Sequence, residues 1–572
     1  MLSKVMPLAV LAAALFAQTP AQHVIRVTTR LVEVNAIVRD KGHFVEGLTK
    51  DDFVLLDNGK PQQIVLFSTS STAGTPGAPQ TPAAPLPANV FSNRPERQAE
   101  TPTNATVVLM DALNTPALDE PYARDQFVKF LRQLKPDDRV AVYALGRKLV
   151  VLNDFTSDAR RLLAAMDRYS RGTLGSAEAT DSSSPDYGAT PSNNDRAGAA
   201  EAGYTGLLQA LQDAADNAAD FATLSDGEIT AAALEAIANH LSPLPGRKSL
   251  IWITSSIPLD IDTAMKLNKA ASADVWELGG ETYRAVKALN DADIAVYPVD
   301  ARGLVPPMQF SASARTSPTP TPVGTKAGKL PSAAVSSKPK AVIMDPSSNM
   351  AIGFAHDSMI GLAKATGGLP FYNSNDIKGA IRKAVDDSEY TYTLGFYSES
   401  SETDMSFHEI KLAVKGKNYE VRSRNGYRAG APAATTEQQR MNLLRDALWS
   451  PLAASSIALA VRADKVDEPK PGSLLLTLGV SATELTLQPK DGKWIGTIDY
   501  MVAQRAADGT FLSKKVKGVE LNPDQEQYRQ MLVDGVRFTS TVEPLPGATQ
   551  IRIVLVDRNS GKVGSVIVPV KQ

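Results

Sequence analysis

The sequence predicts an α/β fold combined with all-β regions: a doubly wound α/β domain is inserted between two β segments, and a C-terminal β-sandwich follows. Strand-like and helix-like segments alternate between residues 104 and 389, which indicates a mostly parallel sheet with helices on both faces. On either side of this region, apolar and polar residues alternate as they do in half-buried strands. The length of 572 residues exceeds what one hydrophobic core serves, so several domains are expected.

The first 21 residues have the pattern of a secretory signal peptide. Lys4 precedes an apolar run from Val5 to Ala17, and small and polar residues follow, with cleavage expected after Ala21 or Ala17. A buried N-terminal helix is the alternative. No later window has about 18 uninterrupted apolar residues, so no membrane span is predicted. The mature protein is therefore expected to be exported, either to the periplasm or out of the cell.

Residues 22–70 are predicted to be the first β segment. Its first half alternates apolar and polar residues, and the dipeptide Asn58-Gly59 between two apolar runs is a hairpin signal. Residues 71–103 are rich in Pro, Ala, Thr and Ser and have no periodicity. They are predicted to be a linker.

Residues 104–389 are predicted to form the α/β domain. Its strands are expected at 106–110, 139–145, 148–155, 248–256, 293–300 and 369–373. Its helices are expected at 122–134, 158–169, 228–241, 275–290, 358–366 and 375–387. Two insertions, 171–200 and 303–350, are rich in small, polar or proline residues, and they are predicted to be flexible.

Residues 390–428 are predicted to be the second β segment. The first segment offers about four strands and the second about three, and seven strands make a sandwich, whereas either set alone makes a poorly covered sheet. The two segments are therefore predicted to complete one sandwich. Two small β additions that pack separately are the alternative. A helical spacer at 429–451 then leads to the C-terminal β-sandwich at 452–572, where turn signals recur.

Five stretches together resemble the von Willebrand factor A (VWA) domain proteins, and more narrowly the VWFA-related family common in Acidobacteria. The resemblance covers about residues 24–428 and implies a VWA (Rossmann-like) α/β domain. The stretches are LTKDDFVLLDNGKPQQIVLF, VVLMDALNT, LPGRKSLIWITSS (244–256), TGGLPFYNSNDIKGAIRKAVDDSEYTYTLGFYS (366–398) and NGYR (425–428). The resemblance also implies a Mg²⁺ or Mn²⁺ site at the C-terminal edge of the sheet, where the ion can accept a carboxylate from a partner protein.

The residues of that metal-ion-dependent adhesion site are only partly present. In the family motif D-x-S-x-S, Asp111 matches the first Asp and Thr115 matches the last hydroxyl, but Leu113 stands at the middle Ser and cannot ligate. The fourth strand ends with Ser255 and Ser256 where the family has an Asp. The site is thus degenerate.

The remaining family ligand, a Thr from a second loop, has no clear counterpart, and Glu228 and Thr230 are the nearest candidates. Two interpretations of the degenerate site are open. In one, Asp111 and Thr115 cap the loop that leads into the first helix, and no cofactor is bound. In the other they bind Mg²⁺ weakly, with Asn114 and Asp300 as further oxygen donors.

The sequence favours protein binding over catalysis. The net charge of −2 does not indicate a nucleic-acid partner. The chain has no cysteine, no nucleophile elbow, no phosphate-binding loop and no paired histidines. A non-enzymatic adhesion-type function is therefore predicted, with a protein ligand at the C-terminal edge of the sheet. The edge residues are Asn114, Ser255, Ser256 and Asp300. A structural role in envelope assembly and a hydrolase with an unrecognised site are the alternatives.

Overall fold

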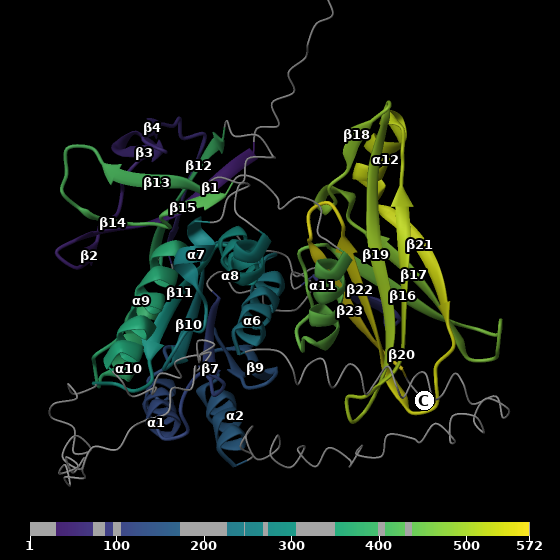
Figure 1. Cartoon of the computed structure of the whole chain (residues 1–572), viewed down its shortest axis with the longest axis horizontal. Helices are drawn as coiled ribbons and strands as arrows, with labels where there is room; N and C mark the ends of the chain where they lie inside the picture. The colour runs from purple at the N-terminus through teal and green to yellow at the C-terminus, as the bar shows by residue number, and fades with distance from the viewer. Residues whose placement is uncertain are drawn as a thin grey trace, which may run out of the picture.

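The computed structural model describes residues 30–71, 86–94, 105–171, 226–244, 246–266, 273–304, 349–398, 407–428 and 437–570. The predicted signal peptide and most of both predicted insertions lie outside these residues. Figure 1 shows three bodies: an N-terminal β domain at the upper left, an α/β domain below it, and a C-terminal β domain at the right. Among the described helices, none combines the length and the apolar character needed to cross a bilayer.

The α/β domain is built on a five-stranded sheet of order β11-β10-β7-β8-β9. The first four strands in this order are parallel, and β9 is antiparallel to β8. The strands are β7 (Thr106–Asp111), β8 (Val140–Leu145), β9 (Leu149–Thr156), β10 (Lys248–Thr254) and β11 (Ile294–Asp300). Only three residues, 146–148, separate β8 from β9. A connection this short permits a hairpin but not the crossover that a parallel strand requires.

Helices cover both faces of this sheet because successive residues of its buried strands point to opposite sides. Val107 and Leu109 of β7 belong to one apolar core, and Val108 and Met110 belong to the other. The first face carries α6 (Asp226–Leu241), α8 (Ala273–Asp291) and α9 (Asn349–Thr366), with α7 (Ile261–Lys266) beside them. The second face carries α1 (Glu120–Leu131), α2 (Ala159–Arg171) and α10 (Ile377–Asp386).

The strand predicted at 369–373 is wrong in extent. Phe371 makes only an isolated bridge with Val299 of β11. The backbone turns at Asn373, which has a φ of 53°, and Asp376 then accepts a hydrogen bond from the Gly379 N–H at the start of α10. The segment is therefore too short to add a strand to the sheet.

The N-terminal β domain takes strands from both flanks of the α/β domain. One sheet has the order β14-β1-β12-β5, with β2 beside β1, and the other has the order β15-β13-β3-β4. The early strands are β1 (Arg30–Asp40), β2 (His43–Phe44), β3 (Phe53–Asp57), β4 (Lys60–Pro61) and β5 (Leu66–Ser71). The late strands are β12 (Tyr390–Ser398), β13 (Phe407–Val414), β14 (Glu420–Arg422) and β15 (Gly426–Arg428).

Pairing between early and late strands joins the two flanks. The two segments share both sheets, because β1 and β5 pair with β12, and β3 pairs with β13. Ser71 and Tyr390 are register partners, so the α/β domain leaves and rejoins this domain at neighbouring points. The hairpin signal at Asn58-Gly59 is confirmed: both residues have positive φ and they connect β3 to β4.

The C-terminal β domain has two sheets that share one apolar core. One sheet has the order β21-β17-β16-β6, and the other has the order β18-β19-β22-β23, with β20 on the other side of β19. The strands are β6 (Val90–Ser92), β16 (Leu459–Val466), β17 (Ser473–Val480), β18 (Gln488–Lys490), β19 (Lys493–Ala506), β20 (Phe511–Leu521), β21 (Val536–Val542), β22 (Ala548–Asp557) and β23 (Val563–Pro569). A helix, α12 (Gln525–Asp534), lies between β20 and β21.

The structure corrects one prediction about a connecting segment and confirms the helix in another. The predicted linker at 71–103 contains β6, which pairs with β16 of the C-terminal β domain. The helix predicted within the spacer at 429–451 is present as α11 (Glu437–Trp449), and its Leu444 and Leu448 are buried against β22. A three-residue strand gives no detectable periodicity, and an amphipathic pattern does not reveal which surface covers the apolar face.

Candidate functional site

Asp111 is the last residue of β7, and the buried strand holds its carboxylate at the C-terminal edge of the central sheet. Its Oδ1 accepts a hydrogen bond from the Asn114 backbone N–H (3.0 Å). Its Oδ2 accepts from the Asn114 side-chain amide (2.9 Å) and from the Trp252 indole N–H (2.9 Å). Burial raises the pKa of Asp111, and hydrogen bonds from Asn114, Thr254 and Trp252 oppose that rise. Protein donors therefore engage both oxygens.

Thr230 extends this network from α6. The Asn114 amide also donates to Thr230 Oγ1 (3.0 Å), and the Thr230 hydroxyl donates to the Asp226 carbonyl (2.6 Å). Thr230 is fully buried, whereas Glu228 lies where α6 meets α11. Of the two candidates for the second loop, the structure brings only Thr230 to Asp111.

Thr115 and the two serines after β10 meet at the same edge. The Ser255 backbone N–H donates to Thr115 Oγ1 (3.2 Å), and the Ser255 hydroxyl donates to Asp119 Oδ2 (3.4 Å). The Ser256 N–H donates to Thr254 Oγ1 (3.3 Å), so this residue closes a local turn. Thr115 and Ser255 thus join the loop after β7 to the end of β10.

Asp300, at the end of β11, belongs to a neighbouring cluster. Both of its oxygens accept from the Arg302 guanidinium (2.9 Å each), and His356 Nε2 lies 2.9 Å from Oδ2. The Tyr372 ring stacks on His356, with 4.6 Å between ring centroids. Burial raises the pKa of Asp119. The charge of Arg302 lowers this pKa, and the charge of Asp300 raises it further. Asp119 therefore interacts with both clusters.

Asp119, Trp252, Arg302 and His356 were not predicted as site residues. Trp252 lies within an apolar strand and reads as a core residue, which it is, although its indole N–H also serves Asp111. His356 comes 56 residues after Asp300, across the predicted 303–350 insertion. No spacing rule in the sequence connects the two.

The oxygen donors present do not fit a tight Mg²⁺ site. Within the described part of the chain, no three His, Asp or Glu side chains are placed to hold a metal ion. A cation at Asp111 would have to displace the donors from Asn114 and Trp252. Leu113, at the family's middle Ser position, packs against the apolar core instead. Mg²⁺ requires several well-placed oxygens before it gives up its hydration shell.

The same edge exposes large apolar side chains. Leu118 is 92% exposed in the loop after β7, Leu304 is 58% exposed after β11, and Phe354 is 57% exposed on α9. Leu304 and Tyr122 are both fixed by Asn375: the Leu304 N–H donates to its side-chain oxygen (2.8 Å), and the Tyr122 hydroxyl donates to its carbonyl (2.7 Å). Leu118 and Leu304 thus lie three and four residues after Thr115 and Asp300, which belong to the polar edge.

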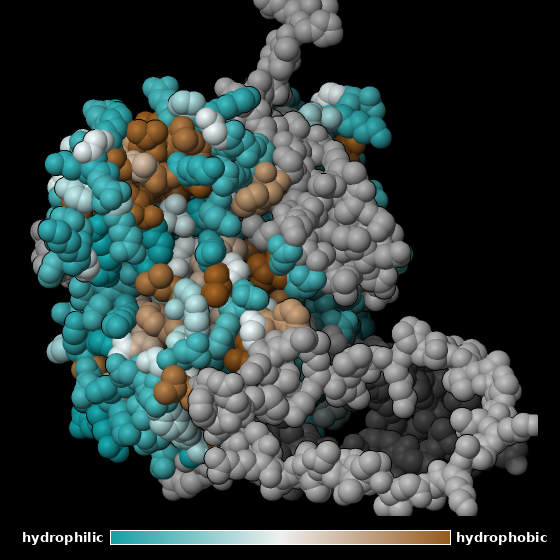
Figure 2. Space-filling view, turned by 60° about the vertical axis from the view of Figure 1, so that its left-hand side comes forward, coloured by the Kyte–Doolittle hydropathy of each residue, from teal (hydrophilic) through white to brown (hydrophobic). Residues whose placement is uncertain are grey.

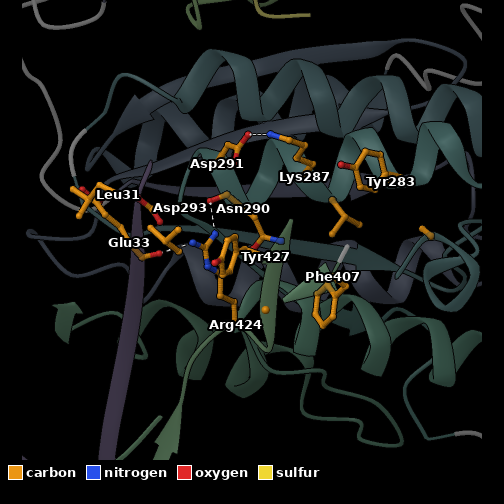
Figure 3. A pocket seen from close by; sticks show the side chains of 14 residues that line it. Leu31, Glu33, Tyr283, Lys287, Asn290, Asp291, Asp293, Phe407, Arg424 and Tyr427 are labelled. Carbon is orange, nitrogen blue, oxygen red and sulfur yellow. Dashed lines mark hydrogen bonds and ion pairs between the residues drawn. The ribbon is translucent and has the colours of Figure 1, made fainter. Parts of the chain in front are cut away.

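A cavity of about 300 Å³ lies at the opposite end of the α/β domain, against the N-terminal β domain. Figure 3 shows the interactions of Lys287 and Arg424 in its lining. Lys287 pairs with Asp291, and the Arg424 guanidinium donates to the carbonyls of Asn290 and Glu33. These contacts hold α8 to β1 and to the chain after β14, so the cavity belongs to the junction of the two domains.

The N-terminal β domain also exposes apolar side chains. Tyr397 of β12, in the first sheet, is 50% exposed. Val65, directly before β5, is 48% exposed. Figure 2 shows apolar residues gathered in the upper part of this face, over the N-terminal β domain.

No protein-family model matches the sequence, and no curated protein is significantly similar to it. Among solved structures, the chain is similar to an aerotolerance-related membrane protein from Bacteroides fragilis NCTC 9343 with multiple mutations to serines. The identity is 14% and the TM-score 0.23, over 50% of this chain and 98% of that one. It is also similar to the conserved hypothetical protein BatB from Bacteroides thetaiotaomicron, with 14% identity and a TM-score of 0.22, over 49% and 97% of the two chains. TM-scores this low carry no argument about function.

Proposed function

We propose that this protein is an exported, non-enzymatic binding protein whose VWA-type α/β domain contacts a protein partner through the C-terminal edge of its central sheet. Asp111, Ser255 and Asp300 follow the adjacent strands β7, β10 and β11. Open α/β sheets bind their ligands outside the carboxyl ends of such strands. The placement of these residues supports an interface at this edge.

The observation that carries the proposal is the exposure of large apolar side chains around the polar edge. Leu118, Leu304 and Phe354 are each more than half exposed, at 92%, 58% and 57%. Single exposed apolar residues need no explanation, but several large ones at one edge, beside polar groups, are a feature of protein contacts. Asn375 already holds the Leu304 backbone and the Tyr122 hydroxyl, so this part of the edge needs little ordering when a partner binds.

In this proposal the family's ligand residues hold the interface loop without a cation. Asp111 ties the loop after β7 to β10 through Trp252 and to α6 through Asn114. The Ser255 hydroxyl and the His356 imidazole contact different carboxylates, those of Asp119 and Asp300. Hydrolysis by a serine needs a nucleophile and a base that are linked by hydrogen bonds. Ser255 and His356 do not form such a pair.

The experiment compares edge variants in a pull-down from envelope extract of the native organism. Leu118→Asp and Leu304→Asp place charge in the proposed interface, and Val533→Asp is the matched control because Val533 is 81% exposed on α12. We expect the edge variants to lose at least about tenfold of the captured partner, since a desolvated charge at an interface core is strongly unfavourable. The control should keep the partner.

Melting temperatures close to that of the unchanged protein would show that the variants fold. An identical set of captured proteins for the edge variants and the control would place the binding surface elsewhere, and the proposal would then be wrong.

A further inference from the structure

The contact between the α/β domain and the C-terminal β domain is formed by α6, α8 and α11. Leu452, just after α11, is buried in the core of the α/β domain. The Ser455 N–H donates to the Asn239 carbonyl (3.0 Å), and His240 Nδ1 lies 3.1 Å from the Ala453 carbonyl. Because α11 also packs on β22, separating α11 from α6 would move the whole C-terminal β domain.

Acidic groups outnumber basic groups where these helices meet. Arg284 of α8 forms ion pairs with Glu235 of α6 (3.3 Å) and with Glu281 of its own helix (3.8 Å). On α11, Arg445 forms an ion pair with Asp446 (3.0 Å). Two guanidinium groups therefore face these three carboxylates.

Further charged groups surround the contact. Glu228 of α6 adds a fourth carboxylate that acts on Glu281 and Asp446. Arg147 and Lys148 lie at its rim, where Arg147 pairs with Asp226 and Lys148 sits over the Trp449 ring. On the other side of Glu235 the remaining charged groups are Arg94, Glu484, Lys287, Asp291 and Lys562. Of these, Arg94 pairs with Glu484 and Lys287 with Asp291.

The burial of this acid excess makes its ionisation unfavourable. Glu235 is only 13% exposed in its side chain. Burial raises the pKa of Glu235 to about 7, Arg284 lowers it, and Asp446 and Glu281 raise it further. Burial likewise raises the pKa of Glu281 and of Asp446. A carboxyl whose pKa is higher in the docked state favours docking at low pH, and this preference is lost as pH rises toward the docked pKa.

We propose that the α6–α8–α11 contact is a pH-sensitive latch: with its carboxyl groups protonated it holds the C-terminal β domain against the α/β domain, and their ionisation loosens it. As pH rises toward 7, Glu235 ionises in a buried position beside Asp446 of α11, and docking weakens. Rising pH changes the geometry between the domains, whereas the fold of each domain stays intact.

The chain contains no cysteine, so two fluorophores can be attached at chosen sites of the full-length protein. Arg160→Cys on α2 and Val533→Cys on α12 place one label on each domain, at side chains that are 93% and 81% exposed. Energy transfer is measured between about pH 5 and pH 9. We expect a short distance at low pH and a longer, broader distribution at high pH, with most of the change complete by about pH 7.

Glu235→Gln removes the ionisable group and keeps the shape, so this variant should stay at the short distance up to pH 9. Glu526→Gln is the matched control, because Glu526 is 80% exposed on α12 and should keep the original midpoint. Should Glu235→Gln fold poorly at pH 5, Glu281→Gln replaces it, with the expected result a smaller lengthening at high pH, because Glu281 no longer opposes the ionisation of Glu235. Unchanged distances from pH 5 to 9, a Glu235→Gln profile like that of the parent, or lengthening that accompanies loss of far-ultraviolet circular dichroism would each overturn the proposal.

Discussion

At the scale of single residues, the C-terminal edge shows a buried carboxylate that serves as a structural hydrogen-bond acceptor. Asp111 accepts from Asn114 on both oxygens and from Trp252 on one. The Trp252 indole, within β10, thus brings a donor to this carboxylate. The loop is thus held by groups that leave little room for a metal ion.

The first prediction concerns metal binding. We expect about 5 mM Mg²⁺ or Mn²⁺ to leave the melting temperature unchanged, because only an ion that binds the folded state tightly stabilises it by mass action. Asp111→Ala should destabilise the α/β domain by roughly 2–4 kcal/mol, since the buried Trp252 and Asn114 donors lose their acceptor. Differential scanning fluorimetry measures both effects. A rise in melting temperature at micromolar metal that disappears in Asp111→Ala would contradict this expectation.

The second prediction concerns Lys248, which is 2% exposed and donates to the Leu244 carbonyl (2.7 Å). Burial lowers its pKa to about 8, while Asp293 and Glu33 act in the opposite direction. The folded state therefore disfavours the charged lysine, and stability should rise as pH increases from about 8 to the ordinary value near 10.5. The gain for this one group is roughly 3 kcal/mol.

Urea unfolding of the protein and of Lys248→Met across this pH range provides the measurement. From about pH 8 to pH 10.5, the unfolding free energy of the unchanged protein should rise by roughly 3 kcal/mol relative to that of Lys248→Met. Parallel pH profiles would show that Lys248 does not titrate in the folded state as described.

At the scale of elements, β6 is a three-residue strand whose place in the sheet depends largely on the side chain of the next residue, Asn93. The Asn93 amide donates to the carbonyls of Ala454 (2.7 Å) and Ile457 (2.8 Å), and its oxygen accepts from the Leu459 N–H (2.9 Å). The three groups belong to the chain that enters β16. Asn93 therefore ties the segment before the α/β domain to the C-terminal β domain.

The third prediction follows from this contact. Asn93→Ala should destabilise the C-terminal β domain by roughly 2–4 kcal/mol, because three buried backbone groups lose their partner. Asn89→Ala is the control: its amide makes one bond, to Asp464 (2.7 Å), in a half-buried position, and its loss should cost at most about 1 kcal/mol. Thermal unfolding followed at Trp494 separates the two variants, and equal effects would count against the assigned role.

The sequence predicted most elements because hydrophobic periodicity and turn-forming residues depend only on residues close together in the chain. The apolar run 106–110 is β7, and the helical spacing at 228–241 is α6. What it missed depends on distant partners. The direction of β9 follows from a three-residue connection, β6 needs β16 to exist as a strand, and the role of α11 is set by β22.

The same limit applies to the candidate site. Asp111, Thr115 and Ser255 were named from motif positions. The structure joins Thr115 to Ser255 by a hydrogen bond, whereas Asp111 bonds to Asn114 and Trp252. The exposure of Leu118 and Leu304 could not be predicted, because the sequence records that a side chain is apolar but not whether anything covers it. Contacts such as His356 with Asp300 depend on how helix α9 returns to the sheet.

At the scale of the whole molecule, the chain crosses between domains more often than its linear order indicates. The N-terminal β domain is closed by strands on both sides of the α/β domain. The C-terminal β domain takes β6 from before the α/β domain. Each β domain therefore needs segments that lie far apart in sequence, and the α/β domain is inserted between neighbouring strands, β5 and β12.

The last prediction tests this insertion by removing it. Ser71 and Tyr390 are cross-strand partners, so a two-residue Asn-Gly turn can join them directly. The shortened protein, residues 30–71 followed by Asn-Gly and residues 390–428, retains every strand of both sheets of the N-terminal β domain. It also retains its apolar core, which consists of Val32, Val34, Ala36, Val38, Phe53, Leu55, Tyr392, Leu394, Phe396, Ile410, Val414 and Tyr427.

We expect this fragment to fold with a stability of a few kcal/mol, as domains of this size do when their core is complete. Asn35 lies beside the α/β domain, but its side-chain oxygen accepts from Thr393 of the same β domain, so exposing this residue to water costs little. Dispersed amide resonances and a cooperative thermal transition are the measurement, and Val34→Asp, which puts a charge in the core, should abolish both. A fragment with the spectrum of an unfolded chain would mean that the α/β domain supplies stability that these strands lack, and the β domain would then not be an independent folding unit.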